Sequence, residues 1–244
     1  YDEERCLPAA LASMHAAARE LGLDYEIVVA DDASADATAA IARSAGARVV
    51  TVSNRQIAKT RNAGAREARG ERLLFVDADT RVDAPVVRAA MSALDSGAVG
   101  GGSRAVFEPG APAYARVLLG AVLGLMRPLR LAAGCFLFCR RDAFEAAGGW
   151  DERHFAGEEI MLSLALRRHG RFVMLEEAVV TSPRKFTSRT FGETLWIMAK
   201  LLARGLGGAR ASPPAPRPRR RRACRALPGR PATARRCAGP RSRS

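Results

Sequence analysis

The sequence predicts an α/β fold in which a mostly parallel sheet is flanked by helices. Over residues 1–97, short apolar runs typical of buried strands alternate with segments whose apolar residues recur at helical spacing. Two of these runs end in paired carboxylates, Asp31-Asp32 after residues 26–30 and Asp77-Ala78-Asp79 after residues 73–76. Because the carboxyl ends of parallel strands meet at one edge of a sheet, both acidic pairs are expected at one crevice.

The elements of the first half follow one another in a regular order. A helix is predicted over residues 7–21, because apolar residues recur every three or four positions, Pro8 suits a first turn and Gly22 suits a stop. Ser34 or Asp36 can cap a short helix that ends near residue 45. The remaining elements are strands at 26–30, 48–52 and 73–76 and helices at 57–68 and 83–96.

The second half is less regular. It reads as an extended segment at 99–108, a helix at 114–126, a strand at 133–138 and a short helix from 141, followed by a helix at 158–169, a strand at 171–175 and an amphipathic helix at 190–202. We therefore predict one domain over residues 1–208, with halves at about 1–97 and 98–208. Residues 209–244 are rich in Pro, Arg and Ala and are predicted to be a disordered tail.

The positive charge of the chain is concentrated in that tail. The net charge is +14, but residues 209–244 hold 12 Arg and no Lys, Asp or Glu, which leaves 27 basic residues against 25 acidic ones in the rest. A nearly neutral body argues against a folded face for specific nucleic-acid binding.

Cysteine content and apolar runs bear on the compartment. The five cysteines show no paired spacing of a disulfide framework and no zinc-ligand pattern, which favours a reducing compartment and a core role for Cys135 and Cys139. The most apolar run, residues 117–126, is far shorter than the roughly 20 residues that span a bilayer. A cytoplasmic location is expected.

The Asp77-Ala78-Asp79 stretch is the first candidate for chemistry. Carboxylate oxygens suit the hard ions Mg²⁺ and Mn²⁺, and these ions in turn bind diphosphates. The pair thus indicates phosphate-ester or nucleotide-sugar chemistry, although an Asp-rich turn after a strand would give the same letters.

The order of motifs resembles the family 2 nucleotide-sugar glycosyltransferases, inverting enzymes of the GT-A fold. In that family a strand precedes the first motif, so the first strand of the fold is expected to be missing from this chain, and Asp2 stands where the family usually has Asn. The resemblance covers about residues 1–202. It rests on Tyr1-Asp2-Glu3-Glu4, Asp31-Asp32-Ala33-Ser34-Ala35-Asp36-Ala37-Thr38, Lys59-Thr60-Arg61-Asn62-Ala63-Gly64, Asp77-Ala78-Asp79, and Gly148-Gly149-Trp150-Asp151-Glu152 with Gly157-Glu158-Glu159.

The resemblance implies a nucleotide site in the first half. Asp32 would accept a hydrogen bond from the ring N–H of the base, and Glu3 or Glu4 would line the nucleoside pocket. Arg61 would contact the base or a phosphate, and Asp77 would lie close to the nucleotide.

The resemblance also implies the reacting groups. Asp79, with Asp77 close by, would hold Mg²⁺ or Mn²⁺, which neutralises charge on the leaving diphosphate. Glu159 is the candidate base for the acceptor hydroxyl, where the family commonly has Asp, and Glu158 is the alternative. Carboxylates at the start of a helix would also be explained by the macrodipole alone.

The substrates are less defined by the sequence. A UDP-sugar is favoured as the donor and GDP-mannose comes next, while the acceptor is a polysaccharide, a polyprenyl phosphate or a small molecule. The amphipathic segment at residues 191–202 and the basic tail would permit peripheral contact with the inner face of the membrane.

Two alternatives stay open. A haloacid-dehalogenase-like phosphatase also has a strand that ends in Asp-x-Asp, but its pattern wants Thr or Val two residues after the second Asp, where this chain has Arg81. The chain could also be an inactive or truncated binding module, because the missing strand would remove one wall of the nucleoside pocket.

Overall fold

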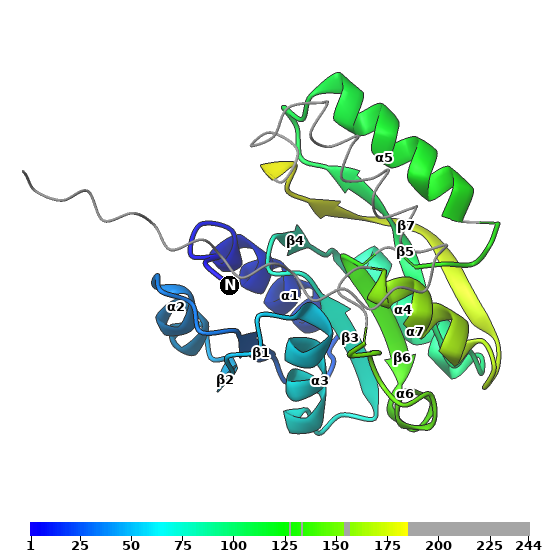
Figure 1. Cartoon of the computed structure of the whole chain (residues 1–244), viewed down its shortest axis with the longest axis horizontal. Coiled ribbons are helices and arrows are strands. Elements are labelled where there is room, and N and C mark those ends of the chain that lie inside the picture. The colour runs from blue at the N-terminus through cyan, green and yellow to red at the C-terminus, as the bar shows by residue number, and fades with distance from the viewer. Residues whose placement is uncertain (127, 133, 154–156, 185–244) are drawn as a thin grey trace, which may run out of the picture. The chain divides into compact units, whose positions relative to one another are not determined.

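The computed structural model describes residues 1–184, except 127, 133 and 154–156 (Figure 1). Helices and strands alternate through the first half, as expected from the apolar periodicity. The elements are α1 (Leu7–Glu20), β1 (Val28–Asp31), α2 (Thr38–Ser44), β2 (Arg48–Thr51), α3 (Ile57–Glu67), β3 (Arg72–Val76), β4 (Thr80–Arg81) and α4 (Ala84–Asp95). Helix α4 begins with a cap, since the Asp83 side chain accepts a hydrogen bond from the backbone N–H of Val86 at 3.1 Å.

The second half continues with longer strands. Its elements are β5 (Gly100–Phe107), α5 (Ala113–Met126), β6 (Phe136–Arg140), α6 (Arg141–Ala146), α7 (Glu158–Leu166) and β7 (Phe172–Thr181). Strand β7 runs six residues beyond the predicted end at 175, because residues 178–181 pair with the far end of β5. The two-residue strand β4 has no counterpart among the predictions.

The strands form two sheets, and the larger one is mixed. Strand β1 pairs with β2 in parallel, and the five-stranded sheet has the order β3-β6-β5-β7-β4. Strands β5 and β7 are parallel, whereas β6 runs antiparallel to both of its neighbours and β4 antiparallel to β7. The α/β class is confirmed, but the pairing corrects the expectation of a mostly parallel sheet, since β6 returns between β3 and β5.

Strand β6 divides the core into two layers. Phe136 and Phe138 pack with α4 on one face, while Leu137 and Cys139 pack with α3, α6 and α7 on the other. All four side chains are fully buried. This alternation follows from the two-residue period of a strand and explains why the run at 136–139 is continuously apolar. The sheet therefore lies between helices on both faces (Figure 1).

Three consecutive glycines allow β5 to pass through the middle of this sheet. A Cβ atom on Gly101 would lie 2.5 Å from the Phe138 ring, and one on Gly102 would lie 2.6 Å from the Cβ of Ala132. No side chain fits at either place without displacing a neighbour. The glycines are thus required by close approach rather than by an unusual backbone angle.

Several expectations concern residues outside the described part. The helix predicted at 190–202, the tail at 209–244 and the domain boundary at 208 lie there and stay predictions. Within the described residues, no helix has the length and apolar character needed to cross a bilayer.

Candidate functional site

The end of strand β3 places two carboxylates beside one another in the chain. A tight turn follows the strand, in which the backbone N–H of Thr80 donates to the carbonyl of Asp77 at 2.9 Å. Asp79 is 8% exposed, and its carbonyl accepts from the N–H of Ser182 at 3.1 Å. The turn and the end of β7 together hold these carboxylates at the edge of the sheet.

Arg61 of α3 contacts both this turn and the start of helix α7. Its Nη2 lies 2.7 Å from Oδ1 of Asp77 and also donates to the carbonyl of Gly134 at 2.9 Å. Its Nη1 lies 3.4 Å from Oε1 of Glu158. The guanidinium carbon stands 4.5 Å from the ring centroid of Trp150, a cation–π arrangement.

The environment keeps Arg61 charged. Burial alone would lower its pKa, but the carboxylates of Asp77 and Glu158 outweigh this and raise the pKa above its ordinary value. Glu158 is 6% exposed and is ion-paired with Arg61. The structure therefore gives Arg61 a definite place between two carboxylates, and contact with a base or phosphate stays a prediction.

Glu159 follows at the start of α7 and has a different environment. Its carboxyl group lies against Gly134, where a Cβ atom would be 3.7 Å from Oε1. Burial, and then the neighbouring charge of Glu158, raise the pKa of Glu159 above its ordinary value. Of the two adjacent glutamates, Glu158 is ion-paired with Arg61, whereas the carboxyl group of Glu159 lies against Gly134.

Helix α3 fixes the turn that precedes these glutamates. Asn62 donates through Nδ2 to the carbonyl of Trp150 and to Oε1 of Glu152, both at 2.9 Å, and its Oδ1 accepts from the N–H of Trp150 at 2.9 Å. Gly149 has φ of 72°, and a Cβ there would lie 2.9 Å from that same Oδ1. The Gly-Gly-Trp-Asp-Glu turn is thus held by the residue next to Arg61.

The N-terminal residues dock on the loop that follows β1. The N–H of Asp2 donates to Oγ of Ser34 at 3.0 Å, and the N–H of Glu3 donates to Oγ1 of Thr38 at 2.8 Å. The Glu4 carboxylate accepts from the N–H of Ala37 at 3.2 Å, just before α2. These bonds explain why the motif at residues 31–38 has short polar residues at Ser34 and Thr38, and they give Glu4 a structural role.

The carboxylates of Glu3 and Asp32 contact different segments of the chain. One oxygen of Glu3 is ion-paired with Arg184, whereas Oε2 is buried and has no hydrogen-bond partner among the described residues. Asp32 accepts from the N–H of Asn54 at 2.6 Å. A buried oxygen without a partner costs free energy unless a ligand supplies a donor.

The sequence of the chain matches a known protein family. The family profile described as Glycosyl transferase family 2 matches residues 1–146, more than half of the chain. The chain belongs to glycosyl transferase family 2. A comparison with curated proteins found no significant match.

Solved structures of similar fold include a mannosyltransferase and a glucosyl-3-phosphoglycerate synthase. TarS 1-349 of S. aureus has a TM-score of 0.56 at 19% identity over 75% of this chain and 58% of its own. The mannosyltransferase PcManGT of Pyrobaculum calidifontis, in complex with GDP-Man and Mn²⁺, has 0.58 at 20% over 75% and 54%. Glucosyl-3-phosphoglycerate synthase of Mycobacterium tuberculosis, with Mn²⁺ and UDP, has 0.58 at 17% over 88% and 78%. The chain thus spans little more than half of the first two structures.

In this family 2 chain the predicted site residues fall into separate groups. Arg61, Asp77 and Glu158 are brought into direct contact, and Glu159 lies next to Glu158. Glu3 is paired with Arg184, which lies three residues after the end of β7. The sequence reasoning assigned no role to Trp150 or Asn62, although both lie inside motifs of the family and the Gly-Gly turn marks the place.

Asp77 and Asp79 are the candidate ligands for a divalent ion at the end of β3. Among the described residues, no group of three or more His, Cys, Asp or Glu side chains could hold a metal ion. Asp77 and Asp79 offer only oxygen atoms, which fits Mg²⁺ or Mn²⁺, and one oxygen of Asp77 is already taken by Arg61. Burial raises the pKa of the nearby Cys135 thiol to about 12.

Proposed function

We propose that this chain transfers a sugar from a nucleotide-sugar donor to an acceptor hydroxyl with inversion at the anomeric carbon. A UDP-sugar is the favoured donor and GDP-mannose the next. The observation that carries the proposal is the position of Arg61, which pairs with Asp77 at the end of β3 and with Glu158 at the start of α7. The next residue of α7 is Glu159, whose pKa is raised. Structures of similar fold are described as complexes with UDP, UDP-GlcNAc and GDP-Man, which supports a nucleotide-sugar donor.

The nucleoside would lie over the loop after β1. The unpartnered Oε2 of Glu3 needs a hydrogen-bond donor, and a ribose hydroxyl or a base N–H would supply one. Asp32 lies on the same loop and keeps a second oxygen for the base, since one accepts from Asn54. Arg184 approaches from the end of β7 and brings a positive charge towards a diphosphate.

Asp79 and the second oxygen of Asp77 would hold Mg²⁺ or Mn²⁺. The ion would neutralise the charge that develops on the leaving diphosphate, and would thus replace the protonated side chain that acts as general acid in other transferases. Asp79 is proposed as the principal ligand, with Asp77 beside it, one of whose oxygens is bound by Arg61. Structures of similar fold described with Mn²⁺ support this assignment.

Glu159 is proposed as the base. Its raised pKa makes it a stronger proton acceptor than an exposed glutamate, and Glu158 keeps Arg61 in place rather than reacting itself. In the transfer, the acceptor oxygen bonds to the anomeric carbon, the bond from that carbon to the diphosphate breaks, and the hydroxyl proton passes to Glu159. The nucleoside diphosphate leaves with the bonding electrons.

Calorimetric titration of UDP and of GDP, with and without Mn²⁺, tests this proposal. Metal-dependent binding that is lost in Asp79→Ala is expected. Asp95→Ala is the matched control, because Asp95 is an exposed carboxylate that only pairs with Arg72 on the surface. Folded protein that binds neither nucleotide, or that binds equally after Asp79→Ala, contradicts the donor site.

A cytoplasmic location at the inner face of the membrane is part of the same proposal. It is supported by the apolar and basic residues at 191–202 and 209–244. Co-sedimentation with anionic vesicles is the direct measurement, and protein that stays in the supernatant at low salt contradicts the membrane contact.

A further inference from the structure

A cavity between helix α5 and strand β5 lies outside the groups described above. Strand β6 pairs only with residues 100–102 of β5, so no described strand covers that edge of β5 from residue 103 onwards, and α5 lies along it instead (Figure 1). The cavity has a volume of about 420 Å³, a size common for small-molecule sites. Its apolar lining includes Phe107, Leu119, Leu123, Leu131, Met174 and Leu175.

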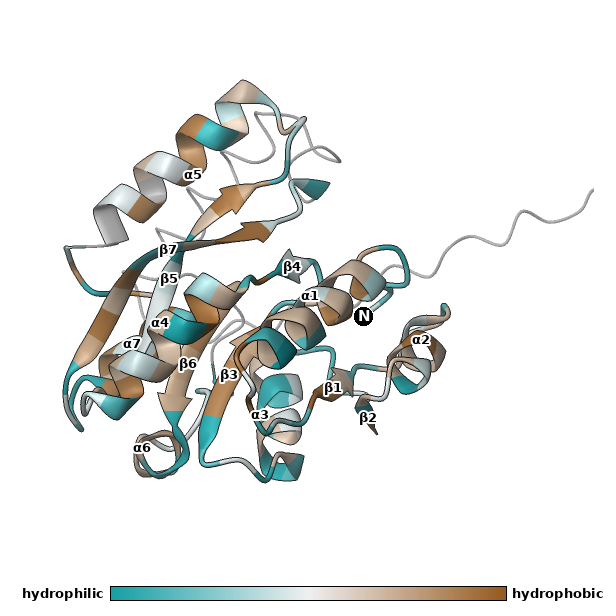
Figure 2. Cartoon of the chain, turned by 180° about the vertical axis from the view of Figure 1, so that it is seen from behind, coloured by the Kyte–Doolittle hydropathy of each residue, from teal (hydrophilic) through white to brown (hydrophobic). Residues whose placement is uncertain are grey.

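The wall formed by α5 is apolar along most of its length (Figure 2). Helix α5 carries a single charged residue, Arg116, and this side chain lines the cavity together with Arg104 of β5. Both arginines are exposed, and neither guanidinium has a hydrogen-bond or ion-pair partner within residues that the structure describes. No carboxylate lines the cavity. An apolar cavity with two uncompensated cations is complementary to a ligand that joins an apolar chain to an anion.

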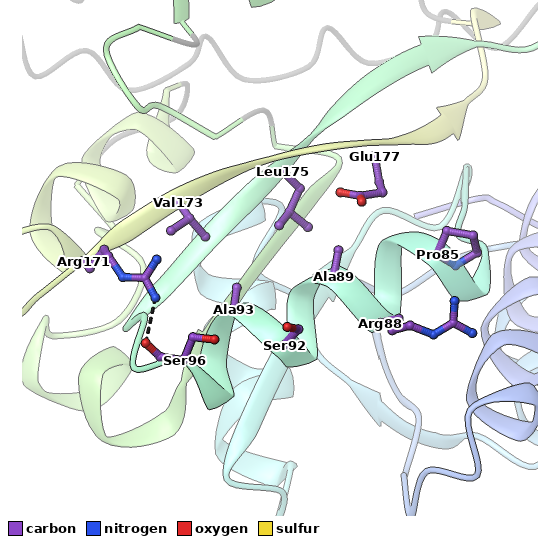
Figure 3. A pocket seen from close by; sticks show the side chains of 10 residues that line it. All are labelled: Pro85, Arg88, Ala89, Ser92, Ala93, Ser96, Arg171, Val173, Leu175 and Glu177. Atoms are coloured by element: carbon purple, nitrogen blue, oxygen red, sulfur yellow. Dashed lines mark hydrogen bonds between the residues drawn. The ribbon is translucent and has the colours of Figure 1, made fainter.

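The groove between α4 and β7 shows the opposite case (Figure 3). It also contains two arginines, but Arg171 donates to the carbonyl of Ser96 at 2.8 Å, and Arg88 lies 3.6 Å from the Glu20 carboxylate. The Glu177 carboxylate lines the groove as well. Its charges are therefore compensated within the fold, and the groove provides a comparison for the cavity beside α5.

The cavity beside α5 is connected to the proposed base through one short segment. Leu131 lines the cavity, and the N–H of the next residue, Ala132, donates to Oγ of Ser163 at 3.1 Å. The Ser163 hydroxyl in turn donates to the carbonyl of Glu159 at 2.7 Å. Gly134, at the other end of the segment, lies against the carboxyl group of Glu159. This segment thus links a wall residue of the cavity to the first turns of α7, the helix that carries Glu159.

We propose that this cavity binds the acceptor, and that the acceptor is an amphiphile in which a phosphate joins an apolar chain to the part that bears the reacting hydroxyl. Arg104 and Arg116 bind the phosphate, and the apolar walls bind the chain. The assignment rests on the proposed function, and the transfer is the one already written, with the hydroxyl proton passing to Glu159.

Binding of farnesyl phosphate to the full chain, below its micellar concentration, tests the assignment. Farnesyl phosphate is expected to bind at least about tenfold more tightly than farnesol or glycerol 1-phosphate, since each of these lacks one half of the complementarity. The double variant Arg104→Ala/Arg116→Ala and the variant Leu119→Asp should each weaken binding about tenfold or more. Arg88→Ala in the compensated groove and Val117→Asp on the exposed face of α5 are the matched controls and should leave binding unchanged.

The outcomes separate the acceptor site from the donor site. Binding of UDP with Mn²⁺ but not of farnesyl phosphate, or farnesyl phosphate binding that is insensitive to both cavity variants, overturns the acceptor assignment and leaves the proposed function standing. Loss of UDP binding alone contradicts the proposed function. If vesicles of phosphatidic acid, whose headgroup carries no hydroxyl beyond its phosphate, bind through the two arginines while monomeric farnesyl phosphate does not, the surface contacts the membrane and the acceptor assignment is wrong.

Discussion

Replacement of Arg61 by Met should destabilise the fold far more than loss of an ordinary surface charge. Glu158 has a side chain that is 8% exposed and lies 3.4 Å from Arg61, so the variant would leave this carboxylate buried without a cation. Breaking a buried ion pair in this way costs about 3–5 kcal/mol of unfolding free energy. Asp77 adds little to this cost, because its side chain is 29% exposed and water can replace the arginine. Met retains the length of the side chain over Trp150.

Urea denaturation at neutral pH measures the effect. Arg66→Met is the control on the same helix, since Arg66 is 70% exposed and lies 3.6 Å from a Glu152 carboxylate in solvent, and a loss of about 0–1 kcal/mol is expected there. The double variant Arg61→Met/Glu158→Gln should regain much of the loss, because it removes the unpaired charge. A loss at Arg61 no larger than at Arg66, or no recovery in the double variant, would refute the reasoning.

Two further predictions concern the base and the sheet. Glu159 must be deprotonated to act as the base and its pKa is raised, so the acidic limb of the kcat/KM profile should lie above pH 4.5, the ordinary pKa of a glutamate. Glu158→Gln removes a neighbouring negative charge and should move this limb to lower pH. A limb that stays in place or moves to higher pH contradicts Glu159 as the base. Gly101→Ala should lower the free energy of unfolding by about 1–3 kcal/mol or more, because the new Cβ would meet the Phe138 ring. Gly120→Ala on α5 is the control and should cause no such loss, since the space around Gly120 is open. Equal melting temperatures for the two variants would contradict the close packing at Gly101.

Much of the fold was predictable from local sequence patterns. The predicted helix at 57–68 corresponds to α3, and the predicted strand at 73–76 to β3, each within a residue or two of the observed bounds. Gly70, three residues after α3, and Asp77, directly after β3, mark where these two elements stop. The direction of β6 was not predictable, because a continuously apolar run shows that a strand is buried on both faces but not which way it runs.

The candidate site was predictable as a set of residues, but its internal contacts were not. The motif order placed Arg61, Asp77 and Glu158 in one family pattern, yet these residues are far apart in sequence, and nothing local indicates that they form an ion-paired group. The role of Asn62 was missed for a related reason. Its bonds to the turn at 149–152 depend on how α3 packs against that turn, which is a property of the tertiary structure.

The glycines of β5 make the candidate site sensitive to substitution at a position that is not expected to contact the substrate. A methyl group on Gly102 would collide with Ala132, and the chain two residues further on provides the carbonyl that Arg61 holds. A substitution there would act on reactivity through displacement of the backbone beside Glu159. In an unbiased mutational screen, Gly102 would therefore be expected among the positions that tolerate no replacement, together with the residues proposed to take part in the reaction.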